Sequence, residues 1–285
     1  MSVARLRDRP AALLLTWASV ALPALVLALP IGGVSGAYFG ERLDGDAFLF
    51  APGGEPLLEA MRLVHRELVG FAVAAPWLAA AYALAAVLPW ACLLVSLSAP
   101  PLPLSAIAAR ALSRMPTLTL LLGLGLACRA IVAAIGSSVA SSLGGASAND
   151  RTATLLSVAA GGATLALLAA VRVLHDLASA AACRHGTRAP SAALHALATL
   201  AERPAALLAR WAALAAGRLA LVVLAGWATA HVGVSSGGRV LAVFLLHQAT
   251  LFALVVLRAA WLRVATAAVG GDDPADSAAR GEIAA

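Results

Sequence analysis

The chain has 285 residues, of which 62% are hydrophobic and 12% are charged, and its mean hydropathy is +0.91. Soluble domains are only about half apolar, so this composition excludes a soluble globular protein and indicates an integral membrane protein. The formal charge of +6 would suit a nucleic-acid partner, but every basic residue is an arginine and most arginines flank apolar runs, so we expect membrane lipids as partners and no nucleic acid.

The apolar runs are long and do not alternate with polar residues. A bilayer core of about 30 Å needs about 20 apolar residues per helix, and lipid excludes irregular backbone. The sequence therefore predicts an all-α, polytopic membrane protein with about six transmembrane helices and additional amphipathic surface helices. The expected spans are residues 11–31, 69–97, 117–140, 152–174, 211–234 and 240–262. They would form a single transmembrane domain over residues 1–268, followed by a disordered cytoplasmic tail over residues 269–285.

The first apolar run follows three arginines in residues 5–9 and is longer than the core of a usual signal peptide, which favours a retained first span. Pro23 and Pro30 are expected to kink this span or to end it. Glycines then recur at four-residue spacing in residues 32–40, which fits either a close helix contact or a flexible exit loop. Span 152–174 carries small residues at helical spacing, which predicts a tightly packed face (Thr154, Ser157, Gly161 and Thr164).

Amphipathic patterns between the spans predict three surface helices, over residues 57–68, 104–115 and 191–203. In the last of these, a leucine-bearing face with Leu194 and Leu197 is expected to face the membrane. The second and third resemble each other, since both end with an arginine near a proline and both lead into an outward span. This similarity suggests a parallel internal repeat.

The polar interval from Arg172 to Arg210 is expected to lie in the cytoplasm. It contains three histidines, an aspartate and a cysteine (His175, His185, His195, Asp176 and Cys183). Their spacing matches no metal-binding pattern, so we interpret them as polar surface residues and expect no metal and no cofactor.

The positions of the arginines predict the orientation, because cytoplasmic loops are enriched in positive charge. Most arginines fall on one side of the predicted spans (Arg5, Arg7, Arg9, Arg110, Arg114, Arg172, Arg184, Arg188, Arg203, Arg210, Arg218, Arg258, Arg263 and Arg280). The opposite side has fewer (Arg42, Arg62, Arg66, Arg151 and Arg239). Both termini are therefore expected in the cytoplasm. The use of arginine without lysine is typical of a GC-rich bacterium, so we place the protein in the bacterial cytoplasmic (inner) membrane.

One candidate ligand-binding site follows from the polar residues inside the spans. Arg129 and His247 are expected at similar depth below the outer surface, with Gln248 beside His247. Arg129 would bind an anionic group while His247 pairs with it or carries protons. The alternative is structural: Arg129 extends to the lipid headgroups, and His247 donates one hydrogen bond between helices.

The amphipathic helices that end near Arg114 and Arg203, together with the segment HDLASAA (His175 to Ala181), resemble uncharacterised bacterial six-span membrane proteins. These are similar to the membrane domain attached to some glycerophosphodiester phosphodiesterases. The resemblance implies a membrane-embedded module that assists a membrane or cytoplasmic protein partner, and it transfers no catalytic residue.

Three functional readings follow. The first is a non-enzymatic scaffold or an accessory or permease-like subunit, because the sequence contains no soluble domain, nucleotide-binding loop or catalytic motif. The second is a transporter of a small molecule or an ion, with a polar pathway near Arg129 and His247. The third is an intramembrane enzyme, which would need a nucleophile with a base in reach, and the sequence shows no such pair.

Overall fold

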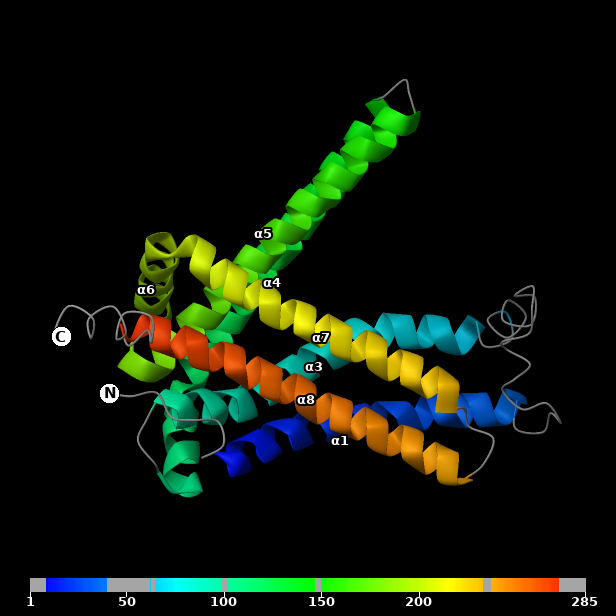
Figure 1. The fold of residues 1–285 in the computed structure, drawn as a ribbon, viewed down its shortest axis with the longest axis horizontal. Coiled ribbons are helices and arrows are strands. Elements are labelled where there is room, and N and C mark those ends of the chain that lie inside the picture. Colours follow the sequence, from blue (N-terminus) through cyan, green and yellow to red (C-terminus); the bar gives the residue numbers. More distant parts are fainter. Residues whose placement is uncertain are drawn as a thin grey trace, which may run out of the picture. The chain divides into compact units, whose positions relative to one another are not determined.

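The computed structural model describes residues 9–39, 62, 65–98, 102–146, 150–232 and 237–271. The described chain is helical, which confirms the all-α prediction (Figure 1). Its helices are α1 (Pro10–Phe39), α3 (His65–Ser98), α4 (Leu104–Ala146), α5 (Asp150–His185), α6 (Ala189–Glu202), α7 (Pro204–Val232) and α8 (Gly237–Val269). The chain divides into two compact units, one made of Thr16–Ala86 and the other of Met1–Leu15 with Val87–Ala285.

Five of the described helices are long and apolar enough to cross a membrane. The corresponding segments are Ala80–Ser98, Leu104–Leu143, Arg151–His185, Pro204–Val232 and Gly238–Val269, and Pro10–Leu25 is a shorter apolar segment. Large apolar side chains on these helices point away from the protein, as do Leu165 and Leu219, which are 68% and 67% exposed. Such surfaces are unfavourable in water and favourable in lipid, so the chain is a multi-pass membrane protein.

Prolines lie inside helices: of the two expectations for Pro23 and Pro30, a kink or an end to the span, the structure excludes the end. α1 continues through Pro23 and Pro30 to Phe39, and α4 continues through Pro116, so the predicted surface helix 104–115 and the following span are one helix. A proline removes one backbone hydrogen bond, and a membrane helix tolerates this loss because the remaining backbone bonds have no competitor in lipid. The chain does break at Arg203 before α7, so the two halves of the proposed repeat differ.

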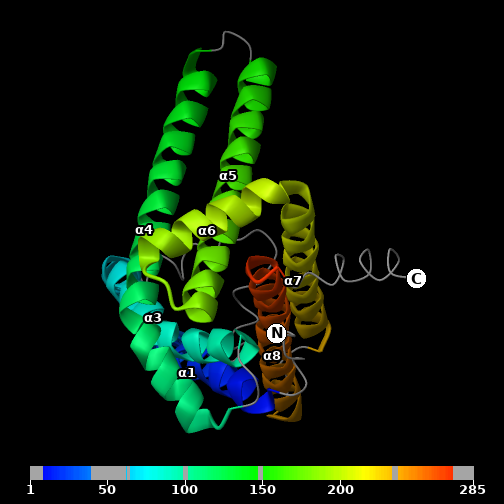
Figure 2. The ribbon, with the colours of Figure 1, turned by 90° about the vertical axis from the view of Figure 1, so that its left-hand side faces the viewer.

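α4 and α5 form an antiparallel hairpin whose helices lie side by side (Figures 1 and 2). The hydroxyl of Ser157 donates to the carbonyl oxygen of Ala140 at 3.4 Å, and Thr164 lies directly against Gly136. Both contacts agree with the predicted small-residue face of α5. Gly161, by contrast, has no neighbouring heavy atom within 4 Å of where a Cβ would lie.

Replacing Gly136 with alanine is expected to destabilise the α4 and α5 hairpin. The added methyl group would overlap the hydroxyl and methyl groups of Thr164, so the helices must separate or shift. Such overpacking costs about 1–3 kcal/mol. Unfolding in mixed micelles measures the loss. The matched control is Gly162→Ala, because Gly162 has nothing within 4 Å of an added Cβ. Equal stability of the two variants would contradict the close contact.

α6 packs on α5 through alanines. Its buried residues are Ala189, Ala192 and Ala196. Leu194 and Leu197, on the face that was expected to contact the membrane, are 68% and 49% exposed and so are available for that contact. Alanine allows the backbones of α5 and α6 to approach closely, which explains why the small face is the packed one.

The side chains that pack most tightly come from the second half of α5, the end of α8 and the end of α3. Fully buried examples are Leu93, Val173, Leu177, Ala259 and Trp261. Two expectations concern residues outside the described chain: most of the predicted surface helix 57–68, and the tail from residue 272 onwards.

Candidate functional site

α5 continues to His185, well past the end predicted for this span at residue 174. Residues assigned to a cytoplasmic polar interval are therefore part of the packed helix. Asp176 is 1% exposed between buried Val173 and Leu177, so its assignment as a surface residue was wrong. His185 and His195 are exposed as expected, and their rings lie 5.1 Å apart.

Asp176 is the centre of a buried polar network that joins α5 to α8. Arg258 donates from Nη1 and Nη2 to the two carboxylate oxygens of Asp176, at 2.5 Å each. Trp261 donates its indole N–H to Asp176 Oδ2 at 2.8 Å, and Arg172 Nε lies 3.6 Å from the same oxygen. The guanidinium of Arg258 also lies over the ring of Trp90, 5.7 Å from its centroid. A carboxylate with this many donors can stay charged in an apolar core.

Positive charge exceeds negative charge around this carboxylate. The sequences of α4, α7 and α8 contain no acidic residue, and Asp150 lies at the opposite end of α5. Arg172 nevertheless interacts electrostatically with Arg258, Arg129 and Arg218. We call Arg129, Arg172, Arg218 and Arg258, with Asp176 and His175, the arginine cluster. The cluster thus contains four guanidinium groups and a single carboxylate.

On α4, the side chain of Arg129 lies beside Gly125. Arg129 Nε donates to the carbonyl oxygen of Gly125 at 2.9 Å. A Cβ placed on Gly125 would lie 2.8 Å from His175 Nδ1 and 3.5 Å from Arg129 Nη2, so both side chains converge on the space left by the missing side chain. Only glycine leaves this space free, which explains its position in α4.

Three buried nitrogens of the arginine cluster have no hydrogen-bond partner among the described residues. They are Arg129 Nη2, His175 Nδ1 and Arg218 Nε. An unpaired donor in an apolar region costs free energy, and an unpaired cation costs more. Among the described residues, the cluster therefore has too few hydrogen-bond acceptors and too little negative charge for its arginines.

The predicted site residues Arg129, His247 and Gln248 do not form one bonded group in the described chain. Arg129 faces His175 on α5. His247 is exposed on α8, with Nδ1 2.9 Å from the carbonyl oxygen of Val243 in its own helix, and Gln248 beside it is half-buried. The proposed role of Arg129 in binding an anion remains a prediction, now with a different histidine as its neighbour.

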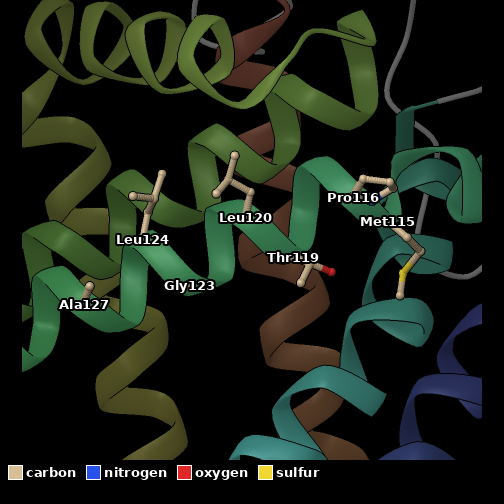
Figure 3. Close-up of a pocket in the computed structure, with 7 residues that line it drawn as sticks. All are labelled: Met115, Pro116, Thr119, Leu120, Gly123, Leu124 and Ala127. Carbon is tan, nitrogen blue, oxygen red and sulfur yellow. The ribbon is translucent and has the colours of Figure 1, made fainter.

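An apolar groove of about 630 Å³ lies on the surface of α4. Its lining residues follow the helix from Met115 to Ala127, and Thr119 contributes the one side-chain hydroxyl among them (Figure 3). None of them belongs to the arginine cluster. The groove offers no charged group and no pair of hydrogen-bond donors, so it is less suited than the arginine cluster to bind a polar ligand.

Two further arginines connect the ends of α4, α5 and α8. Arg114 of α4 donates to the carbonyl oxygen of Gly186 at 3.0 Å, and Arg184 of α5 donates to that of Thr266 at 3.0 Å. Gly186 has a φ of +69°, the left-handed conformation in which glycine ends a helix. These bonds hold the ends of α4, α5 and α8 together, and the same three helices carry Arg129, Arg172 and Arg258.

A sequence signal for Asp176 did exist. Arg172 and Asp176 are four residues apart, a spacing that places them on one helix face, and the aspartate stands among apolar residues. An ionisable residue inside an apolar helix is a candidate functional residue. The prediction missed it because the helix was assumed to end at residue 174.

No family model, curated protein or solved structure matches the chain. The fold and the apolar helices define its class: an all-α, multi-pass membrane protein with an arginine cluster between its helices.

Proposed function

We propose that the chain is a non-enzymatic protein of the bacterial inner membrane that serves as an accessory or permease-like subunit. The arginine cluster is the observation that carries this proposal. Guanidinium groups stay protonated in proteins, so they bind and position anions but do not act as general bases. A site dominated by Arg129, Arg172, Arg218 and Arg258 is therefore suited to binding.

The proposed topology has six spans, with α1 as the first and both termini in the cytoplasm. The arginines support it, because those at the start of α4, the end of α5, in α6 and at the end of α8 all belong to the side predicted to be cytoplasmic (Arg110, Arg114, Arg184, Arg188, Arg203 and Arg263). The bonds from Arg114 to Gly186 and from Arg184 to Thr266 support a common side for these ends.

Single-cysteine labelling tests this topology in intact cells. The native cysteines are first replaced with alanine (Cys92, Cys128 and Cys183). Exposed Ser141, near the far end of α4, and exposed Ser191 in α6 are then each changed to cysteine. We expect a membrane-impermeant maleimide to label the Ser141→Cys variant from outside and the Ser191→Cys variant only after permeabilisation. The reverse pattern would overturn the orientation.

The accessory role is tested by extracting the tagged full chain in a mild detergent from its native host and weighing the intact assembly. We expect a second protein in constant stoichiometry, retained after a further purification step. The resemblance to membrane domains that accompany phosphodiesterases supports a partner enzyme as that protein. Isolation of the chain alone, as a monomer or a homo-oligomer, would contradict the accessory role.

A transporter of a small anion is the second candidate, because the arginine cluster lies among helices that are apolar enough to cross a membrane. The pathway would include Arg129 and pass His247 on α8. Flux into proteoliposomes tests it: Arg129→Ala is expected to abolish uptake while the protein keeps its melting temperature. Unchanged flux in this variant would remove the transporter reading.

A further inference from the structure

We infer that the arginine cluster is a binding site for a phosphate-bearing anion, held by Arg172 together with Arg129, His175 and Arg218. The anion site deepens the proposed function, which already assigns the arginine cluster to binding, but it does not require a partner protein.

The charge balance requires a further anion in the cluster. Asp176 is already engaged by Arg258, Trp261 and Arg172. Among the described residues, neither Arg129 nor Arg218 forms an ion pair with a carboxylate, and α4, α7 and α8 contain no acidic residue. Like charges repel strongly in a region of low dielectric constant. A bound anion with one or two negative charges would reduce this imbalance.

The unpartnered nitrogens, two of which are arginine donors and one of which is a donor in one histidine tautomer, indicate the kind of anion. Arg129 Nη2, His175 Nδ1 and Arg218 Nε come from three different helices, α4, α5 and α7. A phosphate group presents several acceptor oxygens in different directions, so it can accept from donors on separate helices. The planar guanidinium fork matches phosphate in pairs of hydrogen bonds, which favours arginine over lysine at such sites.

The depth of the cluster agrees with a phosphate. Arg172 and Arg258 each end an uncharged apolar stretch, over residues 152–171 and 240–257. Stretches of this length span roughly 27–30 Å as helices, about the thickness of the hydrocarbon core. A hydrocarbon core that covers these two stretches would place both arginines at the level of the phospholipid phosphates, and basic pockets between helices at this level bind anionic headgroups.

The cluster can also be reached from outside the protein. The side chain of Arg172 is 35% exposed, whereas that of Arg258 is 12% exposed and that of Asp176 is 1% exposed. Exposure thus increases from the ion pair toward Arg172. An anion arriving at Arg172 would meet Arg129 and His175 without breaking the Asp176 pair.

The test uses the purified full chain and follows its melting temperature. It is measured in dodecyl maltoside with added phosphatidylcholine, with phosphatidylglycerol, and with sodium phosphate against sodium chloride at equal ionic strength. The double variant Arg129→Gln/Arg218→Gln removes the unmatched charges. The matched control is Arg110→Gln/Arg263→Gln, which removes two exposed arginines of α4 and α8.

We expect phosphatidylglycerol to raise the melting temperature of the natural protein and of the control by several degrees, and the Arg129/Arg218 variant to lose most of this rise. Native mass spectrometry should show the corresponding loss of retained phosphatidylglycerol. A rise with inorganic phosphate that is lost in the same variant also supports the site and assigns it to a soluble phosphate. No rise with either anion, or an equal rise in the variant, overturns the proposal.

A second measurement distinguishes the loss of anion binding from a general loss of stability in the variant. In phosphatidylcholine alone, the Arg129/Arg218 variant is expected to melt no lower than the natural protein, because it has lost two cations that no described acidic residue balances. A large drop in this condition would mean that groups of the protein already satisfy these arginines, and it would overturn the proposal as well.

Discussion

Replacing Asp176 with asparagine is expected to destabilise the protein by about 3–5 kcal/mol, the usual cost of breaking a buried ion pair by removing one partner. Asparagine keeps the shape of the side chain but removes its charge. Arg258 and Arg172 would then lose the carboxylate that both contact. Two more cations would stand without a counter-ion inside the helices. Reversible unfolding of the full chain in mixed micelles measures the difference.

A double variant and a control at an exposed site show whether the loss of stability comes from the buried ion pair. Asp176→Asn/Arg258→Gln removes both members of the pair, and we expect it to be less destabilised than the sum of the single changes because Arg258 is no longer left as a cation against an asparagine, although Arg172 remains. Glu202→Gln, at an exposed site of α6, should change stability by less than about 0.5 kcal/mol. A loss below about 1 kcal/mol for Asp176→Asn is typical of exposed ion pairs and would mean that water reaches the network.

Trp261→Ala is expected to cost about 3 kcal/mol or more, the range seen for removing a large buried aromatic side chain. Trp261 is fully buried, and its indole N–H is one of the donors to Asp176. The alanine variant therefore loses packing contacts and one hydrogen bond to a charged acceptor. Packing contacts matter here because lipid offers no hydrophobic driving force between helices.

Trp227→Ala is the matched control for this change. Trp227 is a tryptophan of α7 that is 62% exposed, and its ring lies 4.2 Å from that of His231 in the same helix. We expect its removal to change the free energy of unfolding by less than about 1 kcal/mol. Trp261→Phe should fall between the two, since it keeps most of the packing and loses the donor. Equal losses for Trp261→Ala and Trp227→Ala would contradict the buried position of Trp261.

The two predicted losses have a common origin, which also bears on the anion site. Asp176 holds Arg258 and Arg172 in place, and Trp261 limits the positions that the carboxylate can take. The arginine cluster is therefore assembled around the ion pair. A change at Asp176 disturbs the position of Arg172, whereas changes at Arg129 and Arg218 leave the pair intact, so the stability and ligand experiments address different groups.

Composition and the lengths of the apolar runs determined the all-α, membrane-spanning character of the chain, because a helix needs about 20 apolar residues to cross the hydrocarbon core. They also located α7 and α8 well: spans were expected at 211–234 and 240–262, and the helices are Pro204–Val232 and Gly237–Val269. Local rules failed at Pro116, inside α4, and at residue 174, inside α5, because proline and isolated charges are tolerated when neighbouring helices pack around them.

Only the tertiary structure decided which helix faces meet. A helix in lipid is apolar on the face that packs and on the face that contacts lipid, so periodicity does not distinguish them, as the buried alanines and exposed leucines of α6 show. Asp176 and Arg258 are 82 residues apart in the chain, and nothing local to either predicts their pairing. That pairing requires α5 and α8 to lie in contact, and the free energy of the buried charge then determines which arginine the carboxylate binds.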